Sequence, residues 1–571
     1  MHVETQPHRV AHKPYGDLLS GACGPDAVAS LRAAERSWRL LLLRALIDAA
    51  DGIPTAPLAP LDDGWALLTR AWEADPEPVE RLLLYPTVGT WAAHALRRVR
   101  GAVPGDSPLW AELGRLHAVA ASAAVLAGVD FRTSVPVRDG WVVLPMLGGA
   151  RVPEPAPDGT AEVFADAGMV HVAGVRQNGP GWFPLRELRA DGCALLLDDL
   201  DPYRALRAPR PPEPLPTADR WSALFAEAWE LLADDDPEAA RAAAGGLRSV
   251  VPRPRAERYR PHSASSGDAF GAVLASEPDD AEQLAATLVH EFQHNKLSAF
   301  MHLFTLHHDG GDERFYAPWR DDPRPLGGLL QGVYAFFGVT RFWRRRRGPG
   351  AEFEYALWRA QTVRALHGIR ASDGLTDLGR KLVDELTGRL TAWQDEPVHG
   401  TARDAARLAA TDHHATWRAH HVVPDRAEVK RAARAYAERS GPVRLPRGAD
   451  VIVAGAPRRG LDTRAVLLRR LLDAPEGLHA LSAAPGAVVE GAHPEDVALV
   501  TGDIDRARRR FERRVREGDA SPDAWVGLGL ALRAESHPAA EVLLARLEFV
   551  MAVHAAVGGG DPVRLASAFR S

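Results

Sequence analysis

Hydrophobic residues in the first part of the chain follow a helical pattern. Apolar segments predict helices over residues 32–51, 91–100 and 109–127. Proline-rich stretches at 54–60 and 103–108 separate these segments. We therefore expect residues 1–128 to form an N-terminal helical region.

The hydrophobic period changes at Val129. Two apolar segments, 131–138 and 141–144, flank Asp139-Gly140, a dipeptide that favours tight hairpin turns. The pattern predicts that these segments pair as a hairpin, and it predicts further strands over 161–164, 169–172 and 193–197. Residues 129–216 are thus expected to be a small β-rich segment that ends in a proline- and arginine-rich linker over 207–216.

Helical patterns resume after the linker. The sequence predicts a helix over 221–247, a short buried strand over 271–276 and a helix over 281–300. It then predicts helices over 326–347, 352–370, 375–394 and 401–421. After Pro442 short apolar pieces alternate with Gly and Pro, and two amphipathic helices at 507–511 and 524–532 faintly resemble one tetratricopeptide unit. One such unit does not establish a repeat array.

These patterns predict a mainly α protein with a small β-rich subdomain (α+β). Besides the first two regions, we expect a helical core over 217–425 and a C-terminal region over 426–571 that ends in the helical pair. A chain of 571 residues exceeds what one hydrophobic core supports, so several domains or subdomains are expected.

Composition narrows the classes of function. The chain is 46% hydrophobic and 25% charged with a net charge of -6, which gives no electrostatic reason to expect nucleic acid or membrane as a partner. The two cysteines, Cys23 and Cys193, are too few and too far apart for a disulfide framework or a thiolate metal site. With neither a signal pattern nor a long apolar segment, the expected location is cytoplasmic. The sequence gives no indication of the oligomeric state.

The most informative motif is His290-Glu291-Phe292-Gln293-His294. Two histidines four residues apart on a helix lie on the same face, where both imidazoles can bind one divalent metal ion. The preceding strand, Ser276 as a helix cap and Pro278 in the first turn give the motif the strand-then-helix context that such a site needs. The alternative interpretation is two core histidines on an amphipathic helix.

A catalytic metal site needs a third protein ligand. Glu354, on a later predicted helix, is our first candidate because a carboxylate from a following helix often completes such a site. Asp322 is the second candidate, and His307 and His308 in the turn after the motif are further alternatives. His302 is too far along the same helix, because eight residues correspond to about 12 Å of rise.

Several segments resemble the HExxH-motif peptide-modification family, also described as 2-oxoglutarate-dependent HExxH-type peptide β-hydroxylases. The segments are TLVHEFQHNKL (287–297), WRDDPRP (319–325), GLLQGVYA (328–335), FEYALWR (353–359), SWRLLLL (37–43) and FRTSVPV (131–137). The resemblance covers roughly residues 15–425. It implies an oxidoreductase of ribosomal peptide (RiPP) biosynthesis that uses Fe(II), 2-oxoglutarate and O₂ to hydroxylate a precursor peptide.

The resemblance also gives the residues roles. Two histidines and one carboxylate form the facial set of non-haem Fe(II) oxygenases, so His290, His294 and Glu354 would hold the iron. The distal carboxylate of 2-oxoglutarate needs a cation of fixed geometry, for which Arg320 and Arg324 are the candidates. The alternative role for both arginines is a structural salt bridge with Asp321 or Asp322.

Glu291 has a different role in each interpretation of the motif. In a zinc peptidase it is the general base that activates water, with Zn(II) as the cofactor. In an oxygenase it is a residue that orients a histidine or a water molecule. A zinc-dependent HExxH metallopeptidase is therefore the main alternative function, and a non-catalytic peptide-binding scaffold is the second.

Overall fold

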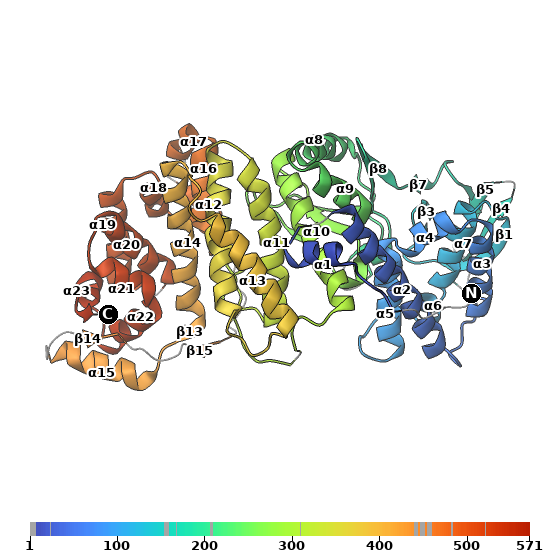
Figure 1. Cartoon of the computed structure of the whole chain (residues 1–571). Helices are drawn as coiled ribbons and strands as arrows, with labels where there is room; N and C mark the ends of the chain where they lie inside the picture. The colour runs from blue at the N-terminus through green and yellow to red at the C-terminus, as the bar shows by residue number, and fades with distance from the viewer. Residues whose placement is uncertain are drawn as a thin grey trace. The chain divides into compact units, whose positions relative to one another are not determined.

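A computed structural model describes residues 7–22, 24–152, 159–166, 168–205, 209–308, 310–438, 443–445, 451–453, 460–480, 484–519 and 521–570. The chain forms two compact units, Met1–Thr305 and Leu306–Ser571 (Figure 1). Both are mainly helical with small sheets, which confirms the mainly α part of the predicted fold class. In the part of the chain that the structure describes, no helix has the length and hydropathy needed to cross a membrane.

The first unit begins with helices separated by proline. Proline occupies the first turn of α2, α4 and α5, where its missing N–H costs nothing. The predicted helix over 109–127 is divided at Gly114 into two helices. The helices of this region are α1 (His12–Leu19), α2 (Pro25–Ala49), α3 (Leu61–Ala74), α4 (Pro76–Leu83), α5 (Pro86–Val99), α6 (Leu109–Leu113) and α7 (Arg115–Leu126).

Two small antiparallel sheets follow. One has the order β1-β4-β5-β6 and the other β2-β3-β7. Their strands are β1 (Phe131–Pro136), β2 (Trp141–Leu144), β3 (Gly148–Arg151), β4 (Thr160–Asp166), β5 (Met169–Val172), β6 (Val175–Arg176) and β7 (Trp182–Pro184). The predicted strands at 161–164 and 169–172 are confirmed as β4 and β5.

The predicted pairing of 131–138 with 141–144 is wrong. Asp139-Gly140 does close a tight turn, in which Arg138 and Trp141 exchange two backbone hydrogen bonds of 2.9 and 2.8 Å. Before the turn, however, the N–H of Val137 donates to the carbonyl of Gly159 at 2.9 Å, and β1 pairs with β4 along its whole length. The two segments therefore enter different sheets.

A five-stranded mixed sheet carries the helix with the HExxH motif. Its order is β11-β12-β10-β9-β8, with β9, β10 and β12 parallel and the two outer strands antiparallel to their neighbours. The elements are β8 (Arg186–Ala190), β9 (Cys193–Leu197), α8 (Asp219–Asp235), α9 (Pro237–Gly246), β10 (Ser249–Arg253), β11 (Ser263–Ala264), β12 (Ala272–Ser276) and α10 (Ala281–Leu303). Helices α8 and α9 provide the long crossover that a parallel pair requires.

The second unit begins with four long helices at the predicted positions. These are α11 (Leu326–Arg345), α12 (Pro349–Ile369), α13 (Asp377–Ala392) and α14 (Gly400–His421). Shorter elements follow: β13 (Val422–Val423), α15 (Arg426–Ala437), β14 (Val443–Arg444), β15 (Val451–Ile452), α16 (Thr463–Asp473), α17 (Pro475–Ala480), α18 (Pro494–Val500), α19 (Ile504–Arg516), α20 (Pro522–Ala534), α21 (Ala539–Ala545), α22 (Leu547–Ala556), α23 (Pro562–Ser567) and β16 (Phe569–Arg570). The predicted helices at 507–511 and 524–532 are confirmed as parts of α19 and α20, of which α19 is amphipathic while residues 524–532 of α20 are all buried. The four-region division of the chain stays a prediction.

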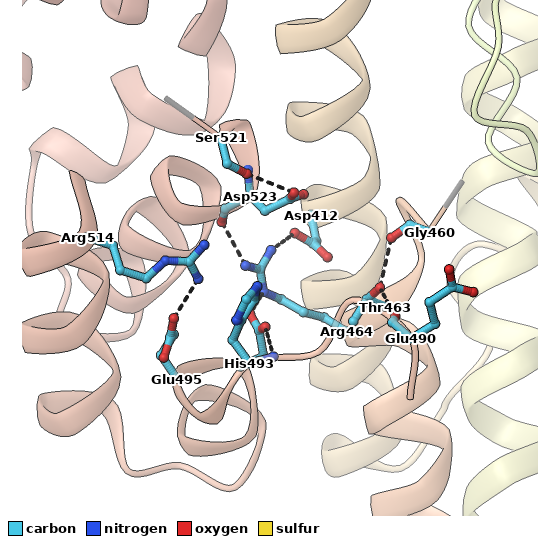
Figure 2. A network of polar contacts seen from close by, with 11 residues as sticks. Asp412, Gly460, Thr463, Arg464, Glu490, His493, Glu495, Arg514, Ser521 and Asp523 are labelled. Carbon is cyan, nitrogen blue, oxygen red and sulfur yellow. Dashed lines mark hydrogen bonds and ion pairs between the residues drawn. The ribbon is translucent and has the colours of Figure 1, made fainter. Parts of the chain in front are cut away.

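Arg464 joins the C-terminal helices to α14 (Figure 2). Its side chain is buried, and it donates to Asp412 on α14, to Asp496 of α18 at 2.8 Å and to the carbonyl of Asp523 at 2.7 Å. Its guanidinium also lies over the ring of Phe511 at 5.4 Å. This buried cation of α16 thus contacts four other helices, α14, α18, α19 and α20. The C-terminal region is therefore integral to the second unit.

Replacing Arg464 by Met should loosen these helices. Removing one partner of a buried ion pair typically costs about 3–5 kcal/mol, because the remaining charges stay buried without compensation. Burial already raises the pKa of Asp412 to about 6, so the loss should be smaller at pH 5, where that carboxyl is protonated, than at pH 8. Hydrogen exchange of α16, α18 and α20 measures the effect. Arg403→Met, which removes an exposed pair with Asp404, is the control and should change exchange very little.

Candidate functional site

The motif helix α10 begins at Ala281, where the predicted helical segment begins, but its cap is not the residue that the sequence predicted. Ser276 is the last residue of β12, and its hydroxyl accepts the N–H of His262 at 3.0 Å instead of capping the helix. Asp280 is the cap, and its carboxylate accepts the N–H of Gln283 at 2.8 Å. The expectation of Ser276 as cap is therefore wrong, because the strand continues to that residue and its hydroxyl is used within the sheet.

His290 and His294 lie side by side on α10. Their Nε2 atoms are 3.1 Å apart and their ring centroids 4.7 Å apart. Two nitrogens at about 2.1 Å from one ion are separated by roughly 3.0 to 3.4 Å when the angle at the metal is between 90 and 109°. The pair therefore has the separation of two ligands of a single ion, for iron and zinc alike.

Local burial favours the metal-binding form of His290. Burial and the neighbouring His294 hold the pKa of His290 well below its ordinary value. A neutral imidazole has the free lone pair that metal coordination requires. The His290 side chain still keeps 20% of its surface exposed, so an ion can reach it from solvent.

Glu291 is a buried carboxyl beside the histidine pair. Only 1% of its surface is exposed, and its Oε1 lies 3.9 Å from Nε2 of His290. Burial raises its pKa, while the charge of His294 and hydrogen bonds from the hydroxyls of Ser263 and Ser265 lower it. Its Oε2 has no hydrogen-bond partner among the described residues. This oxygen can accept or return a proton at the site.

Asn295 fixes α10 to the strand that precedes it. Its side-chain amide donates to the carbonyls of Ala272 at 3.2 Å and Glu291 at 2.8 Å, and its Oδ1 accepts the N–H of Gly271 at 2.6 Å. Gly271 has a φ of 91°, and a Cβ there would lie 2.9 Å from the carbonyl of Gly246. Sequence reasoning missed Asn295, although its position directly after the motif was a signal.

The opposite side of α10 is held by the loop after α1. The Gln293 amide donates to the carbonyl of Gly21 at 3.3 Å, and the ammonium of Lys296 donates to the carbonyl of Ala22 at 3.3 Å. Both side chains are buried. The helix is thus fixed on two sides, so the histidines are held on a rigid element.

His302 has a structural partner at the end of α10. Its Nδ1 lies 2.7 Å from Oε1 of Glu35, a fully buried carboxylate of α2, and its ring stacks on Trp38. The sequence excluded His302 as a ligand to the same metal as His290. Its contacts with Glu35 and Trp38 give it a role in joining α10 to α2.

Glu354 lies on α12 in the second unit and is fully engaged there. Its two oxygens accept from Nε and Nη2 of Arg469 at 2.5 and 3.1 Å, and Oε2 also accepts from Nε1 of Trp358 at 2.7 Å. A metal ion at Glu354 would have to displace at least one of these donors. Its role as third ligand stays a prediction.

The other predicted residues of the second unit also have local partners. Asp322 accepts from Arg320 at 2.9 Å and from Arg324 at 3.1 Å, which is the arrangement that the salt-bridge alternative expects. The Nδ1 atom of His307 lies 3.2 Å from the carbonyl of His308. Within the described ranges, no three His, Cys, Asp or Glu residues are grouped so that they could hold one metal ion.

No model of a known protein family and no curated protein matches the chain. The geometry of the histidine pair on α10 is therefore the structural observation that bears on function.

A second group of buried charges, after β9, was missed from the sequence. Asp198 accepts the hydroxyl of Tyr85 at 2.6 Å and the N–H of Asp201 at 2.9 Å. Asp201 in turn accepts the hydroxyl of Thr87 at 2.8 Å and pairs with Arg115. This group connects the end of β9 to α5 and α7. Because its carboxylates are satisfied by protein donors, it holds the fold together.

Replacing Asn295 by Ala should destabilise the first unit by about 2–3 kcal/mol, because the N–H of Gly271 loses its acceptor inside the protein. Chemical denaturation and hydrogen exchange of the Gly271 amide measure the effect. Thr287→Ala, on the same helix, removes only a bond to the carbonyl of Gln283 and should cost less than about 0.5 kcal/mol. Equal losses in the two variants would contradict the assigned role of Asn295.

Replacing Asp198 by Asn should change how stability depends on pH. Burial and the charge of Asp201 raise the pKa of Asp198 to about 6, against about 3.9 in unfolded chains. The stability from this group is therefore complete below pH 4 and is lost as pH rises through 6, a change on the order of 2–3 kcal/mol. Urea denaturation between pH 4 and 7 should show a smaller decline in Asp198→Asn than in the wild type.

The control for this experiment is Asp191→Asn. Asp191 is exposed and precedes Gly192 in the turn between β8 and β9, where Asn-Gly is as favourable as Asp-Gly. This variant should keep the pH dependence of the wild type. An Asp198→Asn protein with an unchanged pH profile would show that the carboxyl titrates as it does in the unfolded chain.

Proposed function

We propose that the protein is an Fe(II)- and 2-oxoglutarate-dependent oxygenase that β-hydroxylates side chains of a ribosomally synthesised precursor peptide. The observation that carries the proposal is the pair of imidazole nitrogens 3.1 Å apart on a rigid helix. The resemblance of six segments to the peptide β-hydroxylases favours iron and oxidation over zinc and hydrolysis.

In this proposal the histidines of α10 hold the metal. His290 and His294 provide two nitrogen ligands, and Glu354 is the predicted third ligand once it has released Arg469. Iron with 2-oxoglutarate and O₂ supplies the oxidation of a C–H bond. Arg320 or Arg324 is proposed to bind the distal carboxylate of 2-oxoglutarate, which would replace Asp322 as the partner of that guanidinium.

Glu291 has a supporting role in the oxygenase. Its carboxyl lies 3.9 Å from Nε2 of His290, and the hydroxyls of Ser263 and Ser265 lower its pKa against the effect of burial. A buried acid in this place orients a water molecule and holds a proton next to the metal site. It does not have to activate water, so the proposal predicts that its loss is tolerated.

A zinc peptidase is the second candidate, and Glu291 is the observation that favours it. A buried carboxyl with a raised pKa and a free oxygen beside two histidines has the properties of a general base. In that function Glu291 would be indispensable. The two functions thus differ in what the same residue must do.

Anaerobic addition of Fe(II) and 2-oxoglutarate tests the metal assignment. The wild type should bind one iron per chain and show a weak visible charge-transfer band. His290→Ala should bind iron at least about 100-fold more weakly, since one of its ligands is lost. The control is His367→Ala, an exposed histidine of α12, which should keep the band. If His290→Ala keeps the band, the site is assigned wrongly.

Glu291→Gln separates the two functions. In the oxygenase it should keep the band and lose less than about tenfold in 2-oxoglutarate turnover. In a zinc peptidase, loss of the general base should lower hydrolysis by about 10²–10⁴-fold. Peptide cleavage without O₂ that disappears in Glu291→Gln would overturn the oxygenase proposal.

A further inference from the structure

Strand β11 is a free edge of the five-stranded sheet, next to the histidine pair. It is the last strand in the order β11-β12-β10-β9-β8, and Ser263 on it is exposed. An exposed sheet edge offers unpaired backbone groups to another extended chain.

The register of β11 shows which groups point outward. The N–H of Ser276 donates to the carbonyl of His262 at 2.7 Å, and Ser263 lies opposite Ala275. Hydrogen-bonded and non-bonded pairs alternate along an antiparallel ladder, so Ser263 is in a non-bonded pair with β12. Its N–H and C=O therefore face away from the sheet, and within the described residues neither has a hydrogen-bond partner.

The side chain of Ser263 links this edge to the motif. Side chains alternate between the two faces of a strand, so Ser263 and Ser265 point to the same face. The hydroxyls of Ser263 and Ser265 lie near the carboxyl of Glu291 on α10 and lower its pKa, and Oε2 of that carboxyl has no hydrogen-bond partner in the described part of the chain. A strand added at Ser263 would run beside Glu291, at about 4.8 Å from β11.

We propose that an extended segment of the substrate peptide binds as a sixth strand, antiparallel to β11. One peptide residue would exchange both backbone hydrogen bonds with Ser263, as directly opposed residues of an antiparallel pair do. Its side chain would point to the same face as Ser263, toward Glu291 and the histidines. That residue is the one whose β-carbon is modified. This identification of the peptide as substrate rests on the proposed function.

The proposal constrains the peptide. Recognition through backbone groups tolerates many side chains, but the residue opposite Ser263 needs an N–H and so is not proline. The peptide residues directly before and after that residue point their N–H groups away from β11. N-methylation of these two residues should therefore not weaken binding. The binding segment is therefore defined by an extended backbone and by the residue opposite Ser263.

The test uses the full chain and a library of random twelve-residue peptides selected for binding to the wild type. Ser263→Pro removes the outward N–H, which is not part of the ladder with β12. This variant should bind the selected peptides at least tenfold more weakly than the wild type. The matched variant Ser263→Ala removes the same hydroxyl but keeps the N–H, and should change binding less than threefold. Thermal unfolding and iron binding of each variant show that the fold and the metal site persist.

N-methylation of the selected peptides tests the same pairing without changing the protein. Methylation of the residue opposite Ser263 should abolish binding, and methylation of its two neighbours should not. Each of three results would overturn the proposal: the selection yields no binding peptide, Ser263→Pro and Ser263→Ala bind the peptides equally, or the effect of methylation does not alternate along the peptide.

Incubation of the bound peptide with iron, 2-oxoglutarate and O₂ then tests the proposed function separately. A peptide that binds through Ser263 without gaining one oxygen contradicts the hydroxylase and leaves the docking edge established.

Discussion

The three hydrogen bonds of Asn295 are the interaction on which the candidate site depends. They join the middle of α10 to the start of β12, so the helix cannot rotate about its axis without leaving a buried N–H unpaired. That fixed rotation places His290 and His294 on the accessible side and Glu291 near Ser263 of β11 and the following Ser265. The geometry of the pair is therefore set by an amide that no metal would contact.

Much of the fold was predictable because its causes are local. Most helices could be predicted from helix-forming segments and from the prolines that separate them. The four-residue spacing of His290 and His294 predicted their proximity. Features that depend on distant residues were not predictable. The segment 131–138 joins β4 because the N–H of Val137 donates to the carbonyl of Gly159, which is distant in sequence. Ser276 remains in the sheet, where its hydroxyl accepts the N–H of His262.

The two units bury charge in similar ways. In the first, Asp198 and Asp201 are satisfied by Tyr85, Thr87 and Arg115, and in the second, Arg464 is shared between two carboxylates and a carbonyl. Groups of this kind are invisible in hydrophobic periodicity, because each member contributes one polar residue to an otherwise apolar element. They show that buried charge alone does not mark a functional site. Glu291 differs from these carboxylates because its Oε2 has no hydrogen-bond partner among the described residues.

The ion pair between Glu354 and Arg469 has a consequence for metal loading. Arg469 belongs to α16, beyond the segments that resemble the peptide β-hydroxylases, yet its guanidinium takes both oxygens of the predicted third ligand. If Glu354 binds iron, the ion and the arginine compete for one carboxylate, and the free energy of the ion pair is subtracted from that of metal binding. By reciprocity, iron would weaken the attachment of α16 to α12. The C-terminal region would then act as a ligand that the metal must displace.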